Sequence, residues 1–276
     1  MNILILGGDA RQIYCAGRLA LEPGFAVHRF ALGTDAFSGE AAPCDVLLLP
    51  HKPEQGSVIV GSADANGEEV NLSDALNLVK DGGAVFAGKM DDEVVISLES
   101  RKIAVHNWFL DEALTLKNAR LTAEGASQII TKNAPGGVSG SKILILGWGR
   151  VAKACAELFG KMGAGVSIAA RHRETLTDCI YNYAGFIDSD KISEADVIVN
   201  TIPARVFGEE ELKQVRRGAF LLELASAPYG IDFDKARELG IPAILASGVP
   251  GKYTPEEAGR ALAESVLRHL KEGDGT

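Results

Sequence analysis

Two short apolar runs, 140 positions apart, organise the hydrophobic pattern of the chain. Residues 2–16 read NILILGGDARQIYCA and residues 142–156 read KILILGWGRVAKACA, with ILILG and Cys-Ala at matching places. An unbroken apolar run followed by glycine and a helical pattern is typical of a buried parallel strand that opens a βαβ unit. The chain is therefore expected to hold two α/β domains.

Further apolar runs alternate with amphipathic stretches in both halves. The first half has strand candidates at 26–30, 46–49, 84–86 and 103–105, a helical pattern at 72–80 capped by Asn71 or Ser73, and a Gly-, Ser- and Asp-rich stretch at 55–67 that predicts an irregular loop. The second half has strand candidates at 143–146, 166–170, 197–200, 220–224 and 243–245, and helical patterns at 150–162, 209–215, 233–239 and 255–270. This alternation predicts two Rossmann-like domains, each built on a doubly wound parallel sheet.

Two helices are expected to link the domains. A helical pattern at 121–132 ends in the stop signal NAPGG at 133–137 and predicts a crossover helix. Pro255, followed by two acids, predicts the start of a C-terminal helix that returns to the first domain. The expected organisation is a substrate-side domain at 1–120, the crossover helix and linker at 121–137, a dinucleotide-binding domain at 138–254, and the C-terminal helix and tail at 255–276.

Composition narrows the class of protein. The 276 residues are 46% hydrophobic and 24% charged, which is ordinary for a globular chain and excludes a disordered or fibrous one. The net charge of −9 disfavours nucleic-acid or anionic-membrane binding. The four cysteines form no CxxC pair, so no metal site is expected. We find no signal peptide and no membrane span in the sequence, and expect a cytoplasmic protein with reduced thiols.

A glycine-rich turn marks the expected cofactor site. Gly147-Trp148-Gly149-Arg150-Val151-Ala152 is a GxGxxA pattern between a predicted strand and helix. Gly147 allows the tight turn, Gly149 lets the backbone approach a diphosphate, and Ala152 lets the helix pack closely on the strand. The sequence therefore predicts a dinucleotide at the N-terminus of this helix.

The end of the next strand indicates which dinucleotide is bound. An NAD site usually has Asp or Glu about 20 residues after the glycines, to hold the ribose hydroxyls. Here the strand continues into Arg171-His172-Arg173. Because guanidinium groups suit a 2′-phosphate, we predict NADP(H) rather than NAD(H).

The first repeat lacks the cofactor pattern. Asp9 stands where the second repeat has Gly149, and its carboxylate would repel a diphosphate. Asp9 and Arg11 follow the first strand, at the edge where α/β sheets bind ligands, and become candidates for substrate contact. An Asp9 that caps a helix, beside a solvated Arg11, is an equally good interpretation.

Three strand ends in the second half carry small residues and prolines. Thr201 and Pro203 follow the strand candidate at 197–200 and are expected near the ribose and nicotinamide, while the loops at 225–230 and 246–252 follow the next two strands. Such shaped loops are typical of a ligand site, and ordinary βα turns look similar.

Several motifs in order resemble one family. They are GGDAR at 7–11, AEGA at 123–126, LGWGR at 146–150, NTIPA at 200–204, ELASAPYGID at 223–232 and GVPGKYTPEEAG at 248–259. Over nearly the whole chain, the combination resembles the A-subunit of dipicolinate synthase. That family oxidises dihydrodipicolinate to dipicolinate, a pyridine dicarboxylate, with NADP(H) and a separate flavoprotein, the B-subunit. The resemblance implies the same reaction here, on a branch of the lysine pathway, in the mother cell of a sporulating bacterium.

The implied chemistry moves a hydride from a dihydropyridine ring to the nicotinamide and removes one proton. A dicarboxylate needs cationic or polar partners, and the candidates for substrate binding are Arg11, Asn107, Ser226 and Tyr229. The catalytic candidates are Glu124, Asp9 and Lys252, with Arg205 as a further basic residue near a strand end. Each has a structural alternative as a surface charge.

Two rival functions stay open. A 2-hydroxyacid dehydrogenase or adenosylhomocysteinase relative would share the two domains, but the first of these needs a histidine in the last loop, and 247–253 contains none. A non-catalytic NADP(H)-binding redox or regulatory subunit would explain the lack of an obvious catalytic residue. The sequence leaves homo-oligomerisation open.

Overall fold

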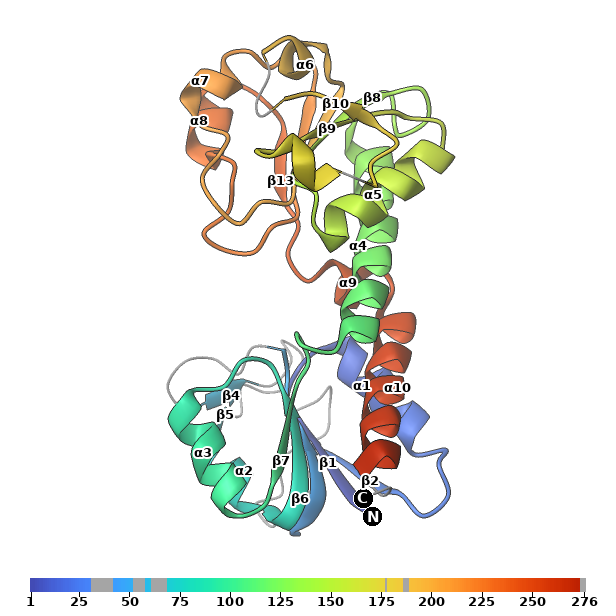
Figure 1. Ribbon diagram of the computed structural model, residues 1–276, viewed down its shortest axis with the longest axis vertical. Coiled ribbons are helices and arrows are strands. Elements are labelled where there is room, and N and C mark those ends of the chain that lie inside the picture. The colour runs from blue at the N-terminus through green and yellow to red at the C-terminus, as the bar shows by residue number, and fades with distance from the viewer. Residues whose placement is uncertain (31–41, 52–57, 61–68, 177, 186–188, 274–276) are drawn as a thin grey trace. The chain divides into compact units, whose positions relative to one another are not determined.

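The computed structural model describes residues 1–30, 42–51, 58–60, 69–176, 178–185 and 189–273 (Figure 1). The chain divides into two compact units. One consists of Met1–Asn118 with Thr254–Thr276, and the other of Ala119–Tyr253. Each unit is built on its own parallel sheet, so the predicted fold class of two Rossmann-like domains is confirmed.

The first unit contains a five-stranded parallel sheet in the order β2-β1-β3-β6-β7. Its strands are β1 (Asn2–Leu6), β2 (Ala26–Phe30), β3 (Cys44–Leu48), β6 (Val79–Ala87) and β7 (Ala104–Asn107). Counted within the sheet, this is the flavodoxin-like order 2-1-3-4-5, in which the order of strand addition reverses between the parallel strands β1 and β3. Ligands of open α/β sheets bind at the carboxyl ends of the strands at such a reversal.

The stretch predicted as an irregular loop holds a strand. β4 (Val58–Val60) pairs antiparallel with β5 (Glu69–Asn71). Turn-forming residues around Val58–Val60 hid this short apolar segment from the sequence pattern. The remaining residues of 55–67 lie outside the described parts of the chain.

Helices cover both faces of the first sheet. α1 (Ala10–Leu19) packs along the C-terminal helix α10 (Pro255–Gly273), which returns to this unit as predicted (Figure 1). The two helices approach each other closely at Gly259, where a methyl group would lie only 2.4 Å from the Arg11 carbonyl oxygen. α2 (Leu72–Asn77) and α3 (Asp92–Ser100) complete the unit. Asn71 caps α2 through the Ser73 N–H, and the helix ends three residues before the predicted end at Lys80, which belongs to β6.

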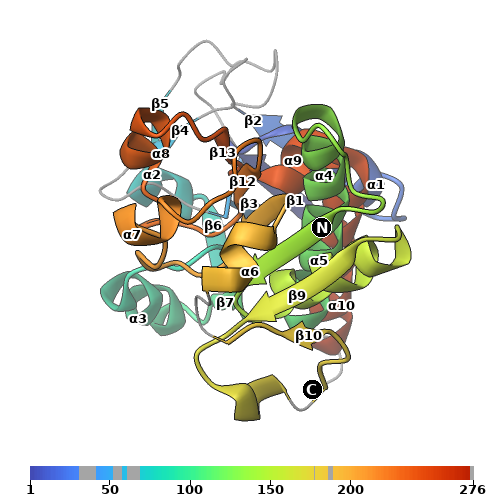
Figure 2. The ribbon, with the colours of Figure 1, turned by 90° about the horizontal axis from the view of Figure 1, so that it is seen from above.

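The second unit contains a six-stranded parallel sheet in the order β10-β9-β8-β11-β12-β13. Its strands are β8 (Lys142–Leu146), β9 (Gly165–Ala169), β10 (Asn182–Tyr183), β11 (Val197–Asn200), β12 (Phe220–Glu223) and β13 (Ala243–Leu245). This is the dinucleotide-binding order 3-2-1-4-5-6, which reverses between β8 and β11. β9 pairs with β8 on one side and with β10 on the other, and Figure 2 shows β9 and β10 side by side near α5 (Arg150–Lys161).

The apolar run of β8 is explained by burial on both faces. Ile143 and Ile145 pack in one core with Phe159, whereas Leu144 and Leu146 pack in the core on the other face. Alternation along a strand places successive side chains on opposite faces, so a central strand must be apolar at every position. The smaller helices are η1 (Arg173–Leu176), α6 (Ser189–Glu194), α7 (Glu209–Leu212), α8 (Phe233–Glu238) and α9 (Val249–Tyr253). The last of these replaces much of the loop predicted at 246–252.

The predicted crossover helix is longer than its sequence pattern. α4 runs from Glu112 to Asn133 and begins nine residues before the predicted start at residue 121. Asp111 fixes this start because its side chain accepts a hydrogen bond from the Leu114 N–H at 3.0 Å. No helix among the described residues is long and apolar enough to cross a membrane.

Candidate functional site

The glycine-rich turn lies at the carboxyl end of β8, beside the strand-order reversal of the second sheet. Gly147 has a positive φ of 103°, and its N–H donates to the Ala169 carbonyl oxygen at 2.8 Å. A methyl group at Gly147 would lie 2.6 Å from Thr201 Oγ1, so the turn and Thr201 are in close contact. Thr201 donates to the Leu146 carbonyl oxygen at 2.7 Å. The structure thus brings Thr201 to the glycine turn, whereas Pro203 is exposed beyond it.

Gly149 is placed to admit an anion at the N-terminus of α5. It is the N-cap in extended conformation, no side chain in the described part of the chain caps the helix, and the first turn contains no acid. A methyl group at Gly149 would meet no protein atom within 4 Å. Ala152 is fully buried and lets α5 pack on the sheet. This open space at the positive end of a helix fits a dinucleotide diphosphate.

The predicted phosphate-binding arginines follow β9. Arg171, His172 and Arg173 are all exposed. The Arg173 guanidinium lies 5.6 Å from the centre of the Tyr183 ring, and the His172 imidazole is 3.3 Å from the Glu174 carboxylate. The segment therefore offers two arginine side chains at the strand end. The Glu174 carboxylate follows directly after Arg173.

Trp148 belongs to a polar cluster that the sequence pattern did not indicate. Its indole N–H donates to Asp178 Oδ1 at 3.0 Å, and Lys153 Nζ lies 2.7 Å from Asp178 Oδ2. Hydrogen bonds from Lys153 and Trp148 hold the pKa of Asp178 below its usual range. The cluster fixes the Trp148 ring beside the glycine turn.

A buried carboxylate organises the neighbouring loop. Glu223, the last residue of β12, is fully buried and accepts four N–H bonds. The donors are Asn200 Nδ2 at 2.7 Å, Ala225 N at 3.0 Å, Gly230 N at 2.8 Å and Ile231 N at 2.9 Å. Burial raises the pKa of Glu223, and these donors partly offset the rise. Sequence analysis missed this residue, although an acid at the end of the apolar run FLLEL was a signal for it.

Ser226 and Tyr229 stand on the loop that Glu223 holds. Ser226 is exposed, and Tyr229 takes a positive φ of 61°. Arg205, also predicted near this edge, pairs with Asp232 at 2.7 Å. The loop is thus defined by backbone bonds to one carboxylate, which leaves the Ser226 hydroxyl at the surface.

Asp9 and Arg11 form an ion pair at the carboxyl end of β1. Asp9 caps α1, and its two oxygens accept from Arg11 Nε and Nη2 at 2.8–3.1 Å. Burial raises the pKa of this carboxyl, but Arg11 outweighs burial and holds it below 3.8. Asp9 is therefore both the helix cap and the side chain that orients Arg11.

The remaining candidates are dispersed. Glu124 is an exposed residue of α4 in a hollow with Arg120, Glu157 and Lys161, and Lys252 is an exposed residue of α9. Asn107, at the end of β7, accepts a hydrogen bond from the Phe109 N–H. The catalytic roles of Glu124 and Lys252 stay predictions.

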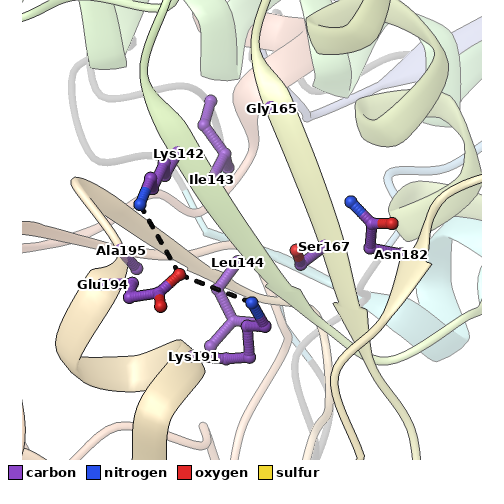
Figure 3. A pocket seen from close by; sticks show the side chains of 9 residues that line it. All are labelled: Lys142, Ile143, Leu144, Gly165, Ser167, Asn182, Lys191, Glu194 and Ala195. Carbon is purple, nitrogen blue, oxygen red and sulfur yellow. Dashed lines mark hydrogen bonds and ion pairs between the residues drawn. The ribbon is translucent and has the colours of Figure 1, made fainter.

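A separate pocket lies at the opposite edge of the second sheet. Figure 3 shows Glu194 between Lys142 and Lys191, at 3.5 Å and 3.4 Å, beside the start of β8 and β9. Because ligands of open α/β sheets bind at the carboxyl ends, this amino-end hollow is a poor candidate for the cofactor. The described part of the chain brings together no group of three His, Cys, Asp or Glu side chains able to hold a metal ion.

Comparison with known proteins agrees with this geometry. Residues 114–229 match the family described as D-isomer specific 2-hydroxyacid dehydrogenase, NAD binding domain. The dipicolinate synthase A-subunit of Bacillus subtilis (strain 168) is 27% identical, over 99% of this chain and 96% of that protein. The crystal structure of this synthase component from Bacillus subtilis superposes with a TM-score of 0.81 at 26% identity, covering 99% of this chain and 96% of that one. The crystal structure of its counterpart from Bacillus halodurans gives the same TM-score at 24% identity, covering 98% and 97%, which bears on the fold alone.

These comparisons confirm that, over its whole length, the chain resembles the A-subunit of dipicolinate synthase. The matched dehydrogenase domain supports a nicotinamide dinucleotide cofactor and an oxidoreductase. The match spans β8, the glycine turn and α5, where the structure offers the open helix N-terminus.

Proposed function

We propose that this chain, which resembles the A-subunit of dipicolinate synthase, oxidises dihydrodipicolinate to dipicolinate with NADP in endospore formation. The observation that carries the proposal is the whole-length resemblance combined with an open, uncapped helix N-terminus at Gly149. The reaction sits on a branch of the lysine pathway, in the cytoplasm of the mother cell.

The chain's own residues bind and orient the cofactor. Gly147 and Gly149 let the backbone approach the diphosphate, and the N-terminus of α5 stabilises its charge. Thr201 is in contact with the turn, and we place it near the ribose and nicotinamide when the cofactor is bound. When bound, the nicotinamide ring accepts the hydride of the substrate.

NADP is preferred to NAD in this proposal because Arg171 and Arg173 stand at the end of β9. Both are exposed, and the ring of Tyr183 lies against the Arg173 guanidinium. A planar guanidinium pairs with a phosphate through two parallel hydrogen bonds, which the ribose hydroxyl of NAD cannot match.

The flavoprotein B-subunit of dipicolinate synthase is the proposed partner, since the relative is named as one subunit of its enzyme. Glu124, Asp9 and Lys252 remain the proposed catalytic groups, and Arg11, Asn107, Ser226 and Tyr229 the proposed substrate contacts. The exposed Ser226 hydroxyl is open to a ligand or to a partner.

The test is NADPH formation from freshly generated dihydrodipicolinate. The full chain is assayed alone and with the flavoprotein partner, with NADP and then with NAD. We expect NADPH formation, and little NADH. Turnover only with the partner would make this chain a cofactor-binding component. NADPH binding without turnover in either case would overturn the proposed reaction, and turnover of a 2-hydroxy acid instead would assign the chain to the dehydrogenases that its second unit matches.

A further inference from the structure

The imidazole of His51 is buried in the first unit, and neither of its ring nitrogens has a hydrogen-bond partner among the residues that the structure describes. His51 lies three residues after β3, at the carboxyl edge of the sheet and beside the β1–β3 reversal. Buried polar atoms in folded proteins are almost always paired, so two unpaired nitrogens on one ring need an explanation. A ligand or a water that binds them here would supply it.

Packing, rather than hydrogen bonding, holds the His51 side chain. Its ring is stacked on Trp108 at a centroid distance of 5.9 Å and meets the edge of Phe109 at 5.8 Å. The backbone of His51 is also closely packed: a methyl group at Gly88 would lie only 1.7 Å from the His51 carbonyl oxygen. Trp108 is itself anchored by its indole N–H, which donates to the Leu49 carbonyl oxygen at 3.0 Å. The imidazole is therefore held in place by contacts with the rings of Trp108 and Phe109.

Two charged side chains act on this imidazole. Burial, reinforced by the Arg11 guanidinium and opposed by the Asp9 carboxylate, lowers the pKa of His51 to about 3. The ring is therefore neutral near neutral pH and presents one N–H donor and one nitrogen acceptor. Arg11, whose side chain is 15% exposed, is held by Asp9. The edge thus combines a fixed cation, a neutral donor–acceptor pair and two aromatic rings.

We propose that this edge of the first sheet is a binding site for a small ring-bearing carboxylic acid. The acid's carboxylate contacts Arg11, its ring lies against the half-exposed Phe109, and its polar ring atom or carboxylate bonds a nitrogen of His51, whose own ring is backed by the buried Trp108. Phe109 is 47% exposed, so its side chain can turn aside to admit the ligand. The site deepens the proposed function, on which its assignment to a pyridine dicarboxylate rests.

The test is binding of dipicolinate itself to the full chain without cofactor. The protein has two tryptophans, so Trp148→Phe leaves Trp108 as the reporter ring beside His51. In this background we expect dipicolinate to change the fluorescence of Trp108. His51→Phe and Arg11→Met are each expected to weaken binding by about 10-fold or more. His28→Gln, which changes an exposed histidine of β2 in the same unit, should leave binding unchanged.

A measurement on the unaltered side chain guards against misfolded variants. Nitrogen-15 NMR of histidine-labelled wild-type protein reports the ring nitrogens directly, with His51→Phe used only for assignment. We expect the His51 nitrogen shifts to move as dipicolinate saturates the site. Unchanged His51 shifts at saturation would overturn the proposal and leave a water on the ring. If dipicolinate binds but dihydrodipicolinate is not oxidised, the proposed function fails and the binding site stands. If His51→Phe leaves oxidation unaffected and dipicolinate does not bind at the site, the proposed function stands and the binding site fails.

Discussion

Asn200 and Glu223 end two neighbouring strands, face each other in register, and are joined by a 2.7 Å hydrogen bond in a fully buried setting. Glu223 uses its second oxygen for the N–H groups of Gly230 and Ile231. The carboxylate therefore connects the carboxyl edge of the sheet to the loop that carries Ser226 and Tyr229. A buried acid without a cation is costly, and four N–H donors compensate for that cost.

Glu223→Gln should destabilise the second unit although it changes a single atom. Each carboxylate oxygen accepts two N–H bonds, so the amide NH₂ of glutamine faces two donors whichever way it turns. Two buried N–H groups then lose their acceptor, and we expect a loss of about 2–3 kcal/mol in the free energy of unfolding. Urea unfolding measures it. Glu238→Gln, at a side chain that is 64% exposed, is the control and should change little; equal stability of Glu223→Gln and wild type would contradict this role.

Gly149→Asp should abolish cofactor binding without unfolding the protein. The substitution gives the second unit the residue that the first has at the matching place, Asp9, and aspartate is a favourable N-cap. The backbone is extended there, and the new Cβ meets no protein atom within 4 Å. The carboxylate would repel a diphosphate, so we expect the Kd for NADPH to rise about 100-fold or more at unchanged stability.

Two further variants separate charge from bulk at this turn. Gly149→Ser keeps a good N-cap without charge, and its smaller effect on the Kd would measure the electrostatic part. Gly147→Ala should behave differently, because it combines a positive φ with a methyl group 2.6 Å from Thr201 Oγ1 and must destabilise the fold. NADPH titration with urea unfolding of each variant tests the set. Undiminished NADPH binding by Gly149→Asp would place the cofactor elsewhere.

Replacement of both Arg171 and Arg173 by alanine should remove the preference for NADP. Loss of two guanidinium partners of a 2′-phosphate is expected to raise the Kd for NADPH by about 10- to 100-fold and to leave that for NADH nearly unchanged. Arg237→Ala, at an exposed arginine of the same unit, is the matched control. Parallel losses for NADPH and NADH would show that the two arginines do not recognise the phosphate.

The elements that the sequence predicted well are those fixed by local patterns. β11 and β13 have their predicted bounds, since an apolar run between turn residues leaves little choice. The start of α4 was wrong by nine residues because the pattern of its first turns is set by packing on α10 and by the Asp111 cap, which joins residues distant in sequence. His51 and Glu223 were missed as site residues for a related reason. Their chemistry depends on what surrounds them, namely two aromatic rings in one case and four N–H groups in the other.

Asp111 ties the start of α4 to the C-terminal helix, and its removal should destabilise the first unit in a pH-dependent way. Its carboxylate accepts from Ser265 Oγ and Arg268 Nη2, both at 2.5 Å, and its side chain is 7% exposed. Burial raises the pKa of Asp111, but Ser265, Leu114 and Arg268 outweigh burial and hold it below 3.8. Asp111→Asn should lower the free energy of unfolding by about 2–3 kcal/mol near neutral pH.

The lowered pKa sets the sign of the pH dependence. A carboxyl whose pKa is lower in the folded state contributes stability that is present above 3.8 and is lost as the pH falls through the folded value. The difference between wild type and Asp111→Asn should therefore be constant above about pH 5 and shrink toward pH 3. Urea unfolding across this range measures it, with Asp234→Asn, at a side chain that is 87% exposed, as the control. A difference that stays the same down to the lowest pH would mean that the neutral hydrogen bonds, and not the charge on Asp111, hold α10 to the start of α4.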